Sequence, residues 1–395
     1  MRVLFLHYGE FHVNSVIQAF HLGEEMTAAG IEVALCGQGP PERIETVGEP
    51  SFECINYEGL ERLLRRWSGE PKETVICAWT PREVVRKATE RATEILEAPY
   101  VVHLEDNEEH LLSGALQLPY EEIARLPRAR LDRICTDDFV HPSHYPRLLE
   151  RASAVTGITE ELNEFNFGDR PYLIARPGVD HERFRPDLEA AVSRRELGLG
   201  PDDFVIVYHG VGHFANQHEL LSLYVAVKLL QRRGRSVKLV RLGTTRLAGV
   251  DPRSFRALMD DMVELGHVQS WRDVPGYLAL ADGYVQPGAP DEFNRYRLPS
   301  KLPEFLSMGR PVILPACNLG NELIDREDAL LLRSGTALEI ATRIEDLLDA
   351  PELARRLGER ARAFALERLT WRRNAGELAD FYWSALEADR EAAPA

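Results

Sequence analysis

The chain has 395 residues, of which 44% are hydrophobic and 28% are charged, and its formal net charge at pH 7 is −16. This length and composition are typical of a globular protein with two domains. The negative charge disfavours nucleic acid as a partner, because phosphate backbones select basic surfaces, and no apolar run is long enough to cross a bilayer. Peripheral membrane contact through a local basic patch stays compatible with this charge.

The chain opens on a short apolar run, residues 3–7. It lacks a small-residue cleavage site and leads straight into a helical pattern, so it predicts a first strand and not a signal peptide. No two of the five cysteines are close in sequence. This spacing favours reduced thiols over a disulfide framework or a zinc site. Together these features predict a cytoplasmic protein.

Strands and helices alternate through the first half of the chain. The predicted strands are residues 3–7, 31–36, 52–57, 74–79, 100–104, 154–159 and 172–175. The predicted helices are residues 13–29, 60–67 and 81–96. Such alternation indicates a mostly parallel sheet covered by helices on both faces.

The same pattern restarts after a segment rich in Pro, Gly and charge, residues 176–200, which we interpret as a linker. The predicted strands are residues 204–208, 237–242, 283–286 and 311–314, and the predicted helices are residues 219–232, 255–265 and 300–308. The tail after residue 337 is predicted to be helical. Its last helix, residues 371–388, has Leu378, Phe381, Tyr382 and Leu386 on one face and needs a groove, which we expect on the first domain.

The most informative segment is residues 286–315. Ser300 is a good N-cap for the predicted helix, and the amino end of a helix attracts phosphate. Lys301 adds a positive charge there, and Glu304 lies one turn later on the same side, where a carboxylate can accept hydrogen bonds from sugar hydroxyls. Taken alone, the motif is equally compatible with a capped surface helix that carries a Lys–Glu pair.

Three stretches resemble glycosyltransferase family 4, also called glycosyl transferases group 1. The stretch PSKLPEFLSMGRPVI, residues 299–313, resembles the family signature P-x-K-x-x-E-[YF]-x-x-x-G-[KR]-P-V. The stretch RPGVDHERFRP, residues 176–186, resembles the segment that precedes the family's donor domain. The run from Gly266 to Pro287 is similar to the family's G-x-V…A-D-x-x-V-x-P pattern.

The resemblance implies an α/β protein of GT-B architecture, with two Rossmann-like αβα domains that face each other across a cleft. It implies an acceptor-binding domain at residues 1–185, joined by a C-terminal helix at about 372–390, and a donor-binding domain at residues 186–371. The implied reaction is retaining transfer of a hexosyl group from a nucleotide diphosphate sugar to an acceptor hydroxyl. The sequence contains no D-x-D triplet, so we expect a metal-independent enzyme that uses the nucleotide-sugar as substrate and has no cofactor.

Residue roles follow from the same resemblance. The loop Gly266–Val268 would hold the base, Ser300 and Lys301 would face the diphosphate, and Glu304 would hold the ribose. The implied donor-binding residues are Gly9, His213, Gly243, His267, Val268, Phe293, Asn294, Arg295, Arg297, Ser300, Lys301 and Glu304. The implied catalytic residues are Glu292 and Asp106.

The sequence departs from the family at three places. The first of the family's two glutamates is displaced, and Glu292 is interpreted as its replacement. No Arg or Lys follows the strand predicted at residues 204–208, so Arg295, Arg297 or Lys301 is expected to compensate, since Arg gives bidentate phosphate contacts. Asp106 lies in a Glu-Asp pair where the family often has His-Asp, and it is equally compatible with a helix cap.

Two other functions remain as alternatives. One is a sugar-nucleotide epimerase of the same fold, which changes its donor without an acceptor. The other is a non-catalytic scaffold that binds nucleotide-sugar, which the displaced glutamate and the missing basic pair would suit. A metal site at His209, His213 and His218 is disfavoured, because Gly210 and Gly212 break any helix that would align the three side chains.

Overall fold

The structure is a computed structural model that describes residues 1–69, 72–212, 216–243, 258, 260 and 262–392. The chain divides into two compact units. Unit 1 comprises Met1–Pro177, Tyr296–Leu298 and Trp371–Ala395, and unit 2 comprises Gly178–Arg295 and Pro299–Thr370. The assignment of acceptor and donor roles to residues 1–185 and 186–371 stays a prediction.

Unit 1 contains a parallel sheet of seven strands in the order β3-β2-β1-β4-β5-β6-β7. Its central strands are continuous apolar runs, because helices cover both faces of a parallel sheet. The strands are β1 (Arg2–Glu10), β2 (Glu32–Gln38), β3 (Glu53–Asn56), β4 (Thr74–Trp79), β5 (Tyr100–Leu104), β6 (Ala154–Gly157) and β7 (Tyr172–Ile174). The predicted doubly wound fold is confirmed for this unit.

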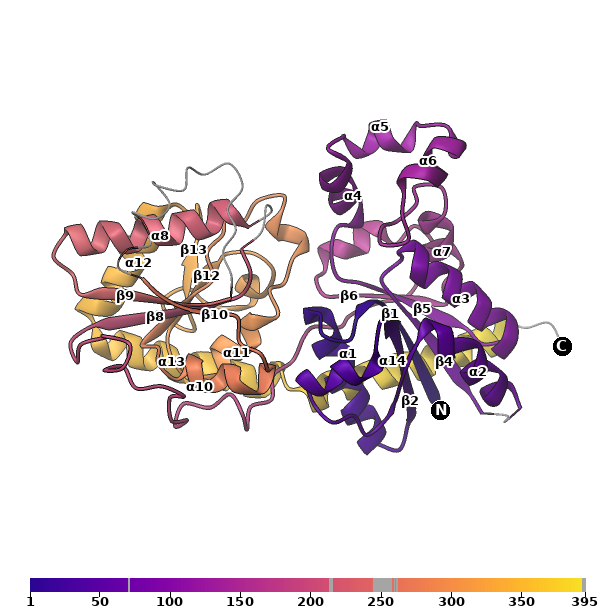
Figure 1. Ribbon diagram of the computed structural model, residues 1–395, viewed down its shortest axis with the longest axis horizontal. Coiled ribbons are helices and arrows are strands. Elements are labelled where there is room, and N and C mark those ends of the chain that lie inside the picture. The colour runs from indigo at the N-terminus through magenta and orange to yellow at the C-terminus, as the bar shows by residue number, and fades with distance from the viewer. Residues whose placement is uncertain (70–71, 213–215, 244–257, 259, 261, 393–395) are drawn as a thin grey trace. The chain divides into compact units, whose positions relative to one another are not determined.

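Eight α-helices and two short 3-10 helices are described in unit 1. They are α1 (Asn14–Ala28), η1 (Pro41–Thr46), α2 (Tyr57–Ser68), α3 (Glu83–Leu96), α4 (Glu108–Leu116), α5 (Tyr120–Ala124), α6 (Arg128–Ile134), α7 (Tyr145–Arg151), η2 (Glu161–Phe165) and α14 (Trp371–Ala392). The sequence did not predict α4 to α7. In Figure 1, α4, α5 and α6 stand beyond the sheet of this unit.

The C-terminal helix α14 packs on unit 1, as predicted. It contacts α1, and Leu378, Tyr382 and Leu386 are buried in the core that includes residues of β1, β4 and α1. The Trp371 indole stacks on the His21 ring at a centroid distance of 4.9 Å. The helix that ends the chain therefore completes the layer of helices on the first sheet.

We expect Leu378→Ala to destabilise unit 1 by about 2–4 kcal/mol, because it leaves a cavity in a close-packed core. Leu378 is 2% exposed, whereas the neighbouring Trp383 is 37% exposed. Thermal unfolding followed by circular dichroism should show a clear fall in Tm for Leu378→Ala and a small change for Trp383→Ala. Equal shifts for the two variants would contradict the packing of α14.

Unit 2 contains a parallel sheet of six strands in the order β10-β9-β8-β11-β12-β13. The strands are β8 (Phe204–His209), β9 (Val237–Leu242), β10 (Val263–Gly266), β11 (Gly283–Val285), β12 (Val312–Pro315) and β13 (Leu330–Leu332). The described helices are α8 (Gln217–Arg232), η3 (Trp271–Asp273), α10 (Val274–Leu278), η4 (Asn294–Tyr296, which spans the division between the units), α11 (Lys301–Ser307), η5 (Asn318–Glu322), α12 (Ala337–Asp349) and α13 (Pro351–Arg368). The second doubly wound domain is thus confirmed.

One predicted helix of unit 2 is wrong at its end. Residues 263–265 fall within the helix predicted at 255–265, but with Gly266 they form β10, which pairs in parallel with β9. Residues 255–257, 259 and 261 of that prediction lie outside the described part of the chain. Pairing along the edge of the sheet overrides the local helical pattern here.

The chain crosses between the units at Pro177/Gly178 and at Thr370/Trp371, and hydrogen bonds hold the residues on either side of these crossings. On the unit 2 side, the Val179 N–H donates to the Leu369 carbonyl at 2.7 Å. On the unit 1 side, the Asn374 side-chain amide donates to the Arg176 carbonyl at 2.9 Å. Most of the predicted linker, residues 176–200, belongs to unit 2, where Phe184 is fully buried.

Candidate functional site

The sheet of unit 2 reverses its strand order between β8 and β11. In an open parallel sheet, ligands bind outside the carboxyl ends of the strands at such a point. The residues at this edge come from the ends of β8, β9 and β10 and from the first turns of α11. Six of the residues that the sequence singled out lie on these segments or next to them: Gly243, His267, Val268, Ser300, Lys301 and Glu304.

Backbone segments approach each other very closely at this edge. Gly243 follows β9 with φ of +96°, and its N–H donates to the Gly266 carbonyl at 2.6 Å. A Cβ atom at Gly243 would lie 2.5 Å from the Gly210 carbonyl oxygen. Only glycine therefore fits between the turn that follows β8 and the end of β10.

Lys301, the first residue of α11, points to the end of β8. Its Nζ donates to the Tyr208 hydroxyl at 2.9 Å. Ser300 lies at the N-cap position as expected, but its backbone angles are helical (φ −57°, ψ −19°) and its side chain makes no capping bond. The turn begins one residue earlier, where the Leu302 N–H donates to the Pro299 carbonyl.

Glu304 is buried, with 7% of its surface exposed. One carboxylate oxygen accepts a hydrogen bond from the Trp271 indole N–H at 2.9 Å. The other lies 2.7 Å from Nε2 of His209, the last residue of β8. Two neighbouring segments thus fix the carboxylate in one orientation, ready to accept hydroxyl donors of a ligand that replaces either contact.

In the segment after β11, Glu292 is exposed to solvent whereas Asn294 is buried. The Glu292 side chain is 77% exposed and lies 3.4 Å from Arg295. Asn294 is buried, and its side-chain amide donates to Glu219 of α8 at 2.7 Å. Its backbone N–H donates to Asp291 at 2.9 Å. The rigid anchor of this segment is therefore Asn294, and the assignment of Glu292 as the replacement glutamate stays a prediction.

The other predicted donor residues are spread over both units. His267 and Val268 follow β10 at its carboxyl end, with His267 exposed and Val268 half-buried. Phe293 lies between Glu292 and Asn294 and is half-buried. Gly9, Asp106 and Arg297 belong to unit 1. His213 lies outside the described residues.

Unit 1 has its own polar cluster at the carboxyl ends of β1 and β4. Gly9 donates its N–H to Nδ1 of His7 at 2.9 Å, and burial lowers the pKa of His7 to about 3. The Arg82 guanidinium lies 3.9 Å from the centroid of the Tyr8 ring and donates to both carboxylate oxygens of Glu108, at 3.0 and 3.1 Å. The sequence did not predict the network of Tyr8, Arg82 and Glu108.

Asp106 does not cap the helix that follows it. The cap of α4 is Asn107, whose side chain accepts from the His110 N–H at 2.9 Å. Burial, with Glu108 as the next cause, raises the pKa of Asp106 to about 6. Burial also raises the pKa of Glu105 to about 8, with a contribution from Asp106. Because Asn107 is the cap, helix capping does not explain why an aspartate stands at position 106. Raised carboxyl pKa values at the end of a central strand are typical of functional sites.

We expect Glu105→Gln to stabilise unit 1 increasingly as the pH rises from about 5 to about 8. The folded state keeps the Glu105 proton up to about pH 8, whereas the unfolded chain releases it in the ordinary carboxyl range. The folded state therefore binds more protons in this window, and the free energy of unfolding falls as the pH rises through it. Each kcal/mol gained should raise Tm by about 2–4 °C.

Thermal unfolding of the wild type and Glu105→Gln across this pH range would check the expectation. Glu121→Gln, on the exposed surface of α5, is the matched control and should leave the pH dependence of Tm as it was. Parallel pH profiles for the wild type and Glu105→Gln would contradict burial of a protonated carboxyl.

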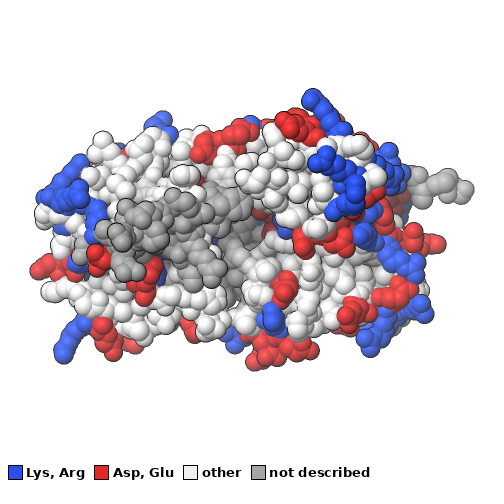
Figure 2. All heavy atoms as spheres, turned by 45° about the horizontal axis from the view of Figure 1, so that its top comes forward, with Lys and Arg blue, Asp and Glu red and all other residues white. Residues whose placement is uncertain are grey.

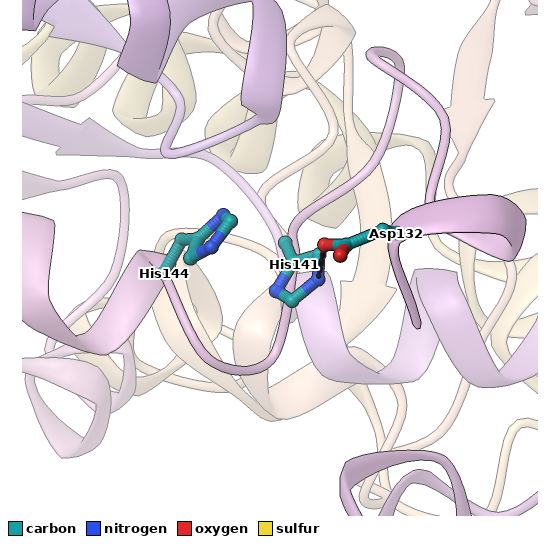
Figure 3. Close-up of side chains that lie close together, drawn as sticks. All are labelled: Asp132, His141 and His144. Carbon is teal, nitrogen blue, oxygen red and sulfur yellow. Dashed lines mark ion pairs between the residues drawn. The ribbon is translucent and has the colours of Figure 1, made fainter. Parts of the chain in front are cut away.

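Asp132, His141 and His144 bring one potential metal ligand each within 4.8 Å of one another, as Figure 3 shows. The Ser143 N–H donates to Nδ1 of His141 at 3.1 Å. In neutral His141 the proton is therefore on Nε2, which faces Asp132 at 3.3 Å. The rings of His141 and His144 are stacked at 3.9 Å with an angle of 16°, so their in-plane lone pairs do not converge on one point. The trio suits hydrogen bonding better than metal binding.

The charged side chains are intermixed on the face drawn in Figure 2, where neither sign covers a broad area. Among the described helices, none combines the length and the apolar character needed to cross a membrane.

Four residues of unit 2 at this edge were not predicted to bind the donor. Tyr208 and His209 end β8, Trp271 lies in η3, and Arg241 lies near the end of β9. Arg241 is fully buried and pairs in register with Tyr208. A charged residue on the strand face that carries Val237 and Leu239 was the available signal, because buried arginines are rare.

Comparison with known proteins gives a consistent likeness. Residues 203–350 match the sequence model described as glycosyl transferases group 1. The protein EpsD of Bacillus subtilis (strain 168), named as a glycosyltransferase, is 30% identical over 229 residues, which cover 56% of this chain and 57% of that protein. The chain spans about half the length of the curated relatives that it matches.

Solved structures share the fold over nearly the whole chain. Anabaena Alr3699/HepE in complex with UDP superposes with a TM-score of 0.67 at 16% identity and covers 97% of this chain and 100% of its own. A protein from Listeria monocytogenes, titled as a UDP-N-acetylglucosamine 2-epimerase, has a TM-score of 0.58 at 13% identity and covers 100% of this chain and 97% of its own. At such identities the likeness shows the fold alone.

Proposed function

Through residues 203–350 this chain belongs to the glycosyl transferases group 1 family, and we propose that it is a retaining glycosyltransferase that moves a sugar from a nucleotide diphosphate sugar to an acceptor hydroxyl. The observation that carries this proposal is the edge of unit 2 where Lys301 and Glu304 lie beside the close backbone approach of Gly210 and Gly243. A cation, backbone amides and a fixed carboxylate are what a diphosphate joined to a ribose needs.

In this proposal unit 2 binds the donor. The backbone of Gly266–Val268 holds the base, Ser300 and Lys301 hold the diphosphate, and Glu304 accepts the ribose hydroxyls. The segment from Glu292 to Arg295 lies against the transferred sugar. The burial of Glu304 supports its role. Because the carboxylate is already desolvated, a ligand hydroxyl can bind it at little further cost in desolvation free energy.

Unit 1 would bind the acceptor. Gly9 lies near the end of β1 and Asp106 follows β5, at the carboxyl edge of its sheet, where ligands bind in open parallel sheets. The raised pKa of Asp106, about 6, supports a role for this carboxyl in moving a proton near neutral pH. Arg297 belongs to the same unit, and we propose that it contributes to holding the donor.

The reaction that we propose transfers a hexosyl group without a metal ion. The acceptor oxygen attacks the anomeric carbon from the face that the diphosphate leaves, and the leaving phosphate takes the hydroxyl proton. Lys301 and the amino end of α11 stabilise the negative charge that develops on the diphosphate. The donor that we propose to test first is a UDP-sugar, since UDP and UDP-glucose are bound in structures of the same fold. The five cysteines form no disulfide, which supports a reducing, cytoplasmic setting.

A thermal-shift screen with UDP-, GDP-, ADP- and dTDP-sugars tests the proposal, because a ligand of the native state raises Tm. We expect one nucleotide class to raise Tm in the wild type and to lose this effect in Lys301→Ala. Incubating that donor alone and then with candidate acceptors separates transfer from epimerisation. No shift with any donor would refute the proposal, and a changed sugar nucleotide without acceptor would replace it by the epimerase.

A further inference from the structure

Arg241 is a charged residue in a place that the fold normally fills with apolar side chains. It lies on β9 on the same face as Val237 and Leu239 and is 0% exposed. Its guanidinium donates to the Gly210 carbonyl at 3.1 Å. Its Cζ lies 4.7 Å from the centroid of the Tyr208 ring, because Tyr208 and Arg241 are paired across the two strands.

Tyr208 links Arg241 to the first turn of α11. The Lys301 Nζ lies 2.9 Å from the Tyr208 hydroxyl and 4.3 Å from the centroid of its ring. The ring is therefore in contact with two cations that come from different elements. The Tyr208 ring thus connects the Arg241 guanidinium to the Lys301 ammonium.

The Gly210 peptide is fixed by the same group of residues. Its φ is +130°, and a Cβ at this position would lie 2.7 Å from the Lys301 Nζ. On the other side its carbonyl receives Arg241 and lies against Gly243. Contacts with Arg241, Lys301 and Gly243 thus restrict the conformation of the Gly210 peptide.

Burial of a guanidinium is costly, and a leucine or methionine at this position would fill the same core at lower cost. A retained charge therefore points to a task that an apolar side chain cannot perform. The segment directly after β8, residues 210–212, contains no Arg or Lys. Arg241 brings a positive charge to this same turn from the neighbouring strand.

We propose that Arg241 is a positioning residue for the donor diphosphate. It holds the Gly210 peptide and the Tyr208 ring, which aims the Lys301 ammonium and the backbone amides of the turn at the phosphates, and its buried charge raises the local potential that attracts them. The ligand chemistry that it serves is a nucleoside diphosphate, so this inference rests on the proposed function. Arg241 would also replace part of the Arg and Lys pair that the family has after the first strand of the donor domain, although it comes from the neighbouring strand.

Isothermal titration with a nucleoside diphosphate and its own nucleoside tests the proposal. UDP with uridine is the first pair, and GDP, ADP or dTDP with its nucleoside follows if it binds more tightly. We expect Arg241→Met to weaken diphosphate binding by about tenfold or more, as for loss of one charge-assisted interaction, with nucleoside binding within about twofold of the wild type. Arg241→Lys should restore part of the loss, and diphosphate binding by Arg241→Met should depend less on salt.

Arg2→Met is the matched control, since Arg2 is equally buried, donates to the Trp67 carbonyl at 3.1 Å and lies over the Trp67 ring, but at the amino end of β1. It should lower Tm and leave the diphosphate-to-nucleoside affinity ratio unchanged. An unchanged ratio in both Arg241 variants would overturn the inference and leave the proposed function standing. Parallel loss of diphosphate and nucleoside binding would assign Arg241 a structural role only. If the wild type binds none of the four diphosphates, the proposed function fails first.

Discussion

Gly243→Ala is expected to destabilise unit 2 by about 3 kcal/mol or more and to abolish diphosphate binding. The new methyl group would lie 2.5 Å from the Gly210 carbonyl oxygen, and the backbone φ of +96° disfavours any side chain. Both partners are backbone atoms, so neither can rotate away. The turn after β8 has to move, and the Arg241 and Lys301 contacts move with it.

The matched control for this prediction is Gly234→Ala. Gly234 follows α8 with φ of +79°, and nothing lies within 4 Å of its added Cβ. This variant should cost about 1 kcal/mol, the conformational penalty alone, and bind diphosphate normally. Denaturant unfolding and nucleotide titration measure the two effects separately. Similar losses in both variants would mean that positive φ, and not the close approach, decides the effect.

Glu304→Ala is expected to lower kcat/KM by about 10²–10⁴-fold, because in the proposed function this carboxylate accepts two charge-assisted hydrogen bonds from the ribose. It also leaves the Trp271 indole N–H and His209 without the carboxylate they contact. A fall in the free energy of unfolding of about 1–3 kcal/mol should accompany the kinetic loss. Steady-state kinetics with the donor found by the thermal-shift screen give the first quantity, and denaturant unfolding gives the second.

Two further variants isolate the role of the Glu304 charge. Glu304→Gln keeps an acceptor for Trp271 and should lose less stability than Glu304→Ala while it still loses most of the activity. Glu359→Ala removes a carboxylate that is 63% exposed on α13, and its kinetics should stay within about twofold of the wild type. Wild-type kcat/KM in Glu304→Gln would show that the carboxylate does not touch the donor.

The central strands were predictable because their apolar runs are local signals. Strands β4 and β5 begin and end where the sequence predicted. The helices α4 to α7 were missed because most are short, and α5 and α6 each follow directly after a proline, Pro119 or Pro127, so no helical period develops. β10 was missed for another reason, since its identity as a strand depends on pairing with Val240 and its neighbours in β9.

The predicted site divides in the same way. Lys301 and Glu304 were found because a single contiguous motif carries both. Their partners Tyr208, His209 and Trp271 come from two other segments, and the contacts depend on how strand ends align in the sheet. Ser300 lies at the predicted cap position but makes no side-chain capping bond, because the turn starts at Pro299, a backbone detail that the residue type does not encode. Arg241 was recognisable as a charged residue in a strand, but its partners Tyr208 and Gly210 are distant in sequence, so no local motif indicated its role.

The hydrogen bonds beside the two crossings between the units, Asn374 to Arg176 and Val179 to Leu369, have a consequence for proteolysis. A protease that cut the chain between Thr370 and Trp371 would leave α14 as a separate peptide. This peptide would keep its buried Leu378, Tyr382 and Leu386, its bond from Asn374 to Arg176 and its stack on His21. The nicked protein should therefore migrate as one particle under native conditions and as two fragments once unfolded.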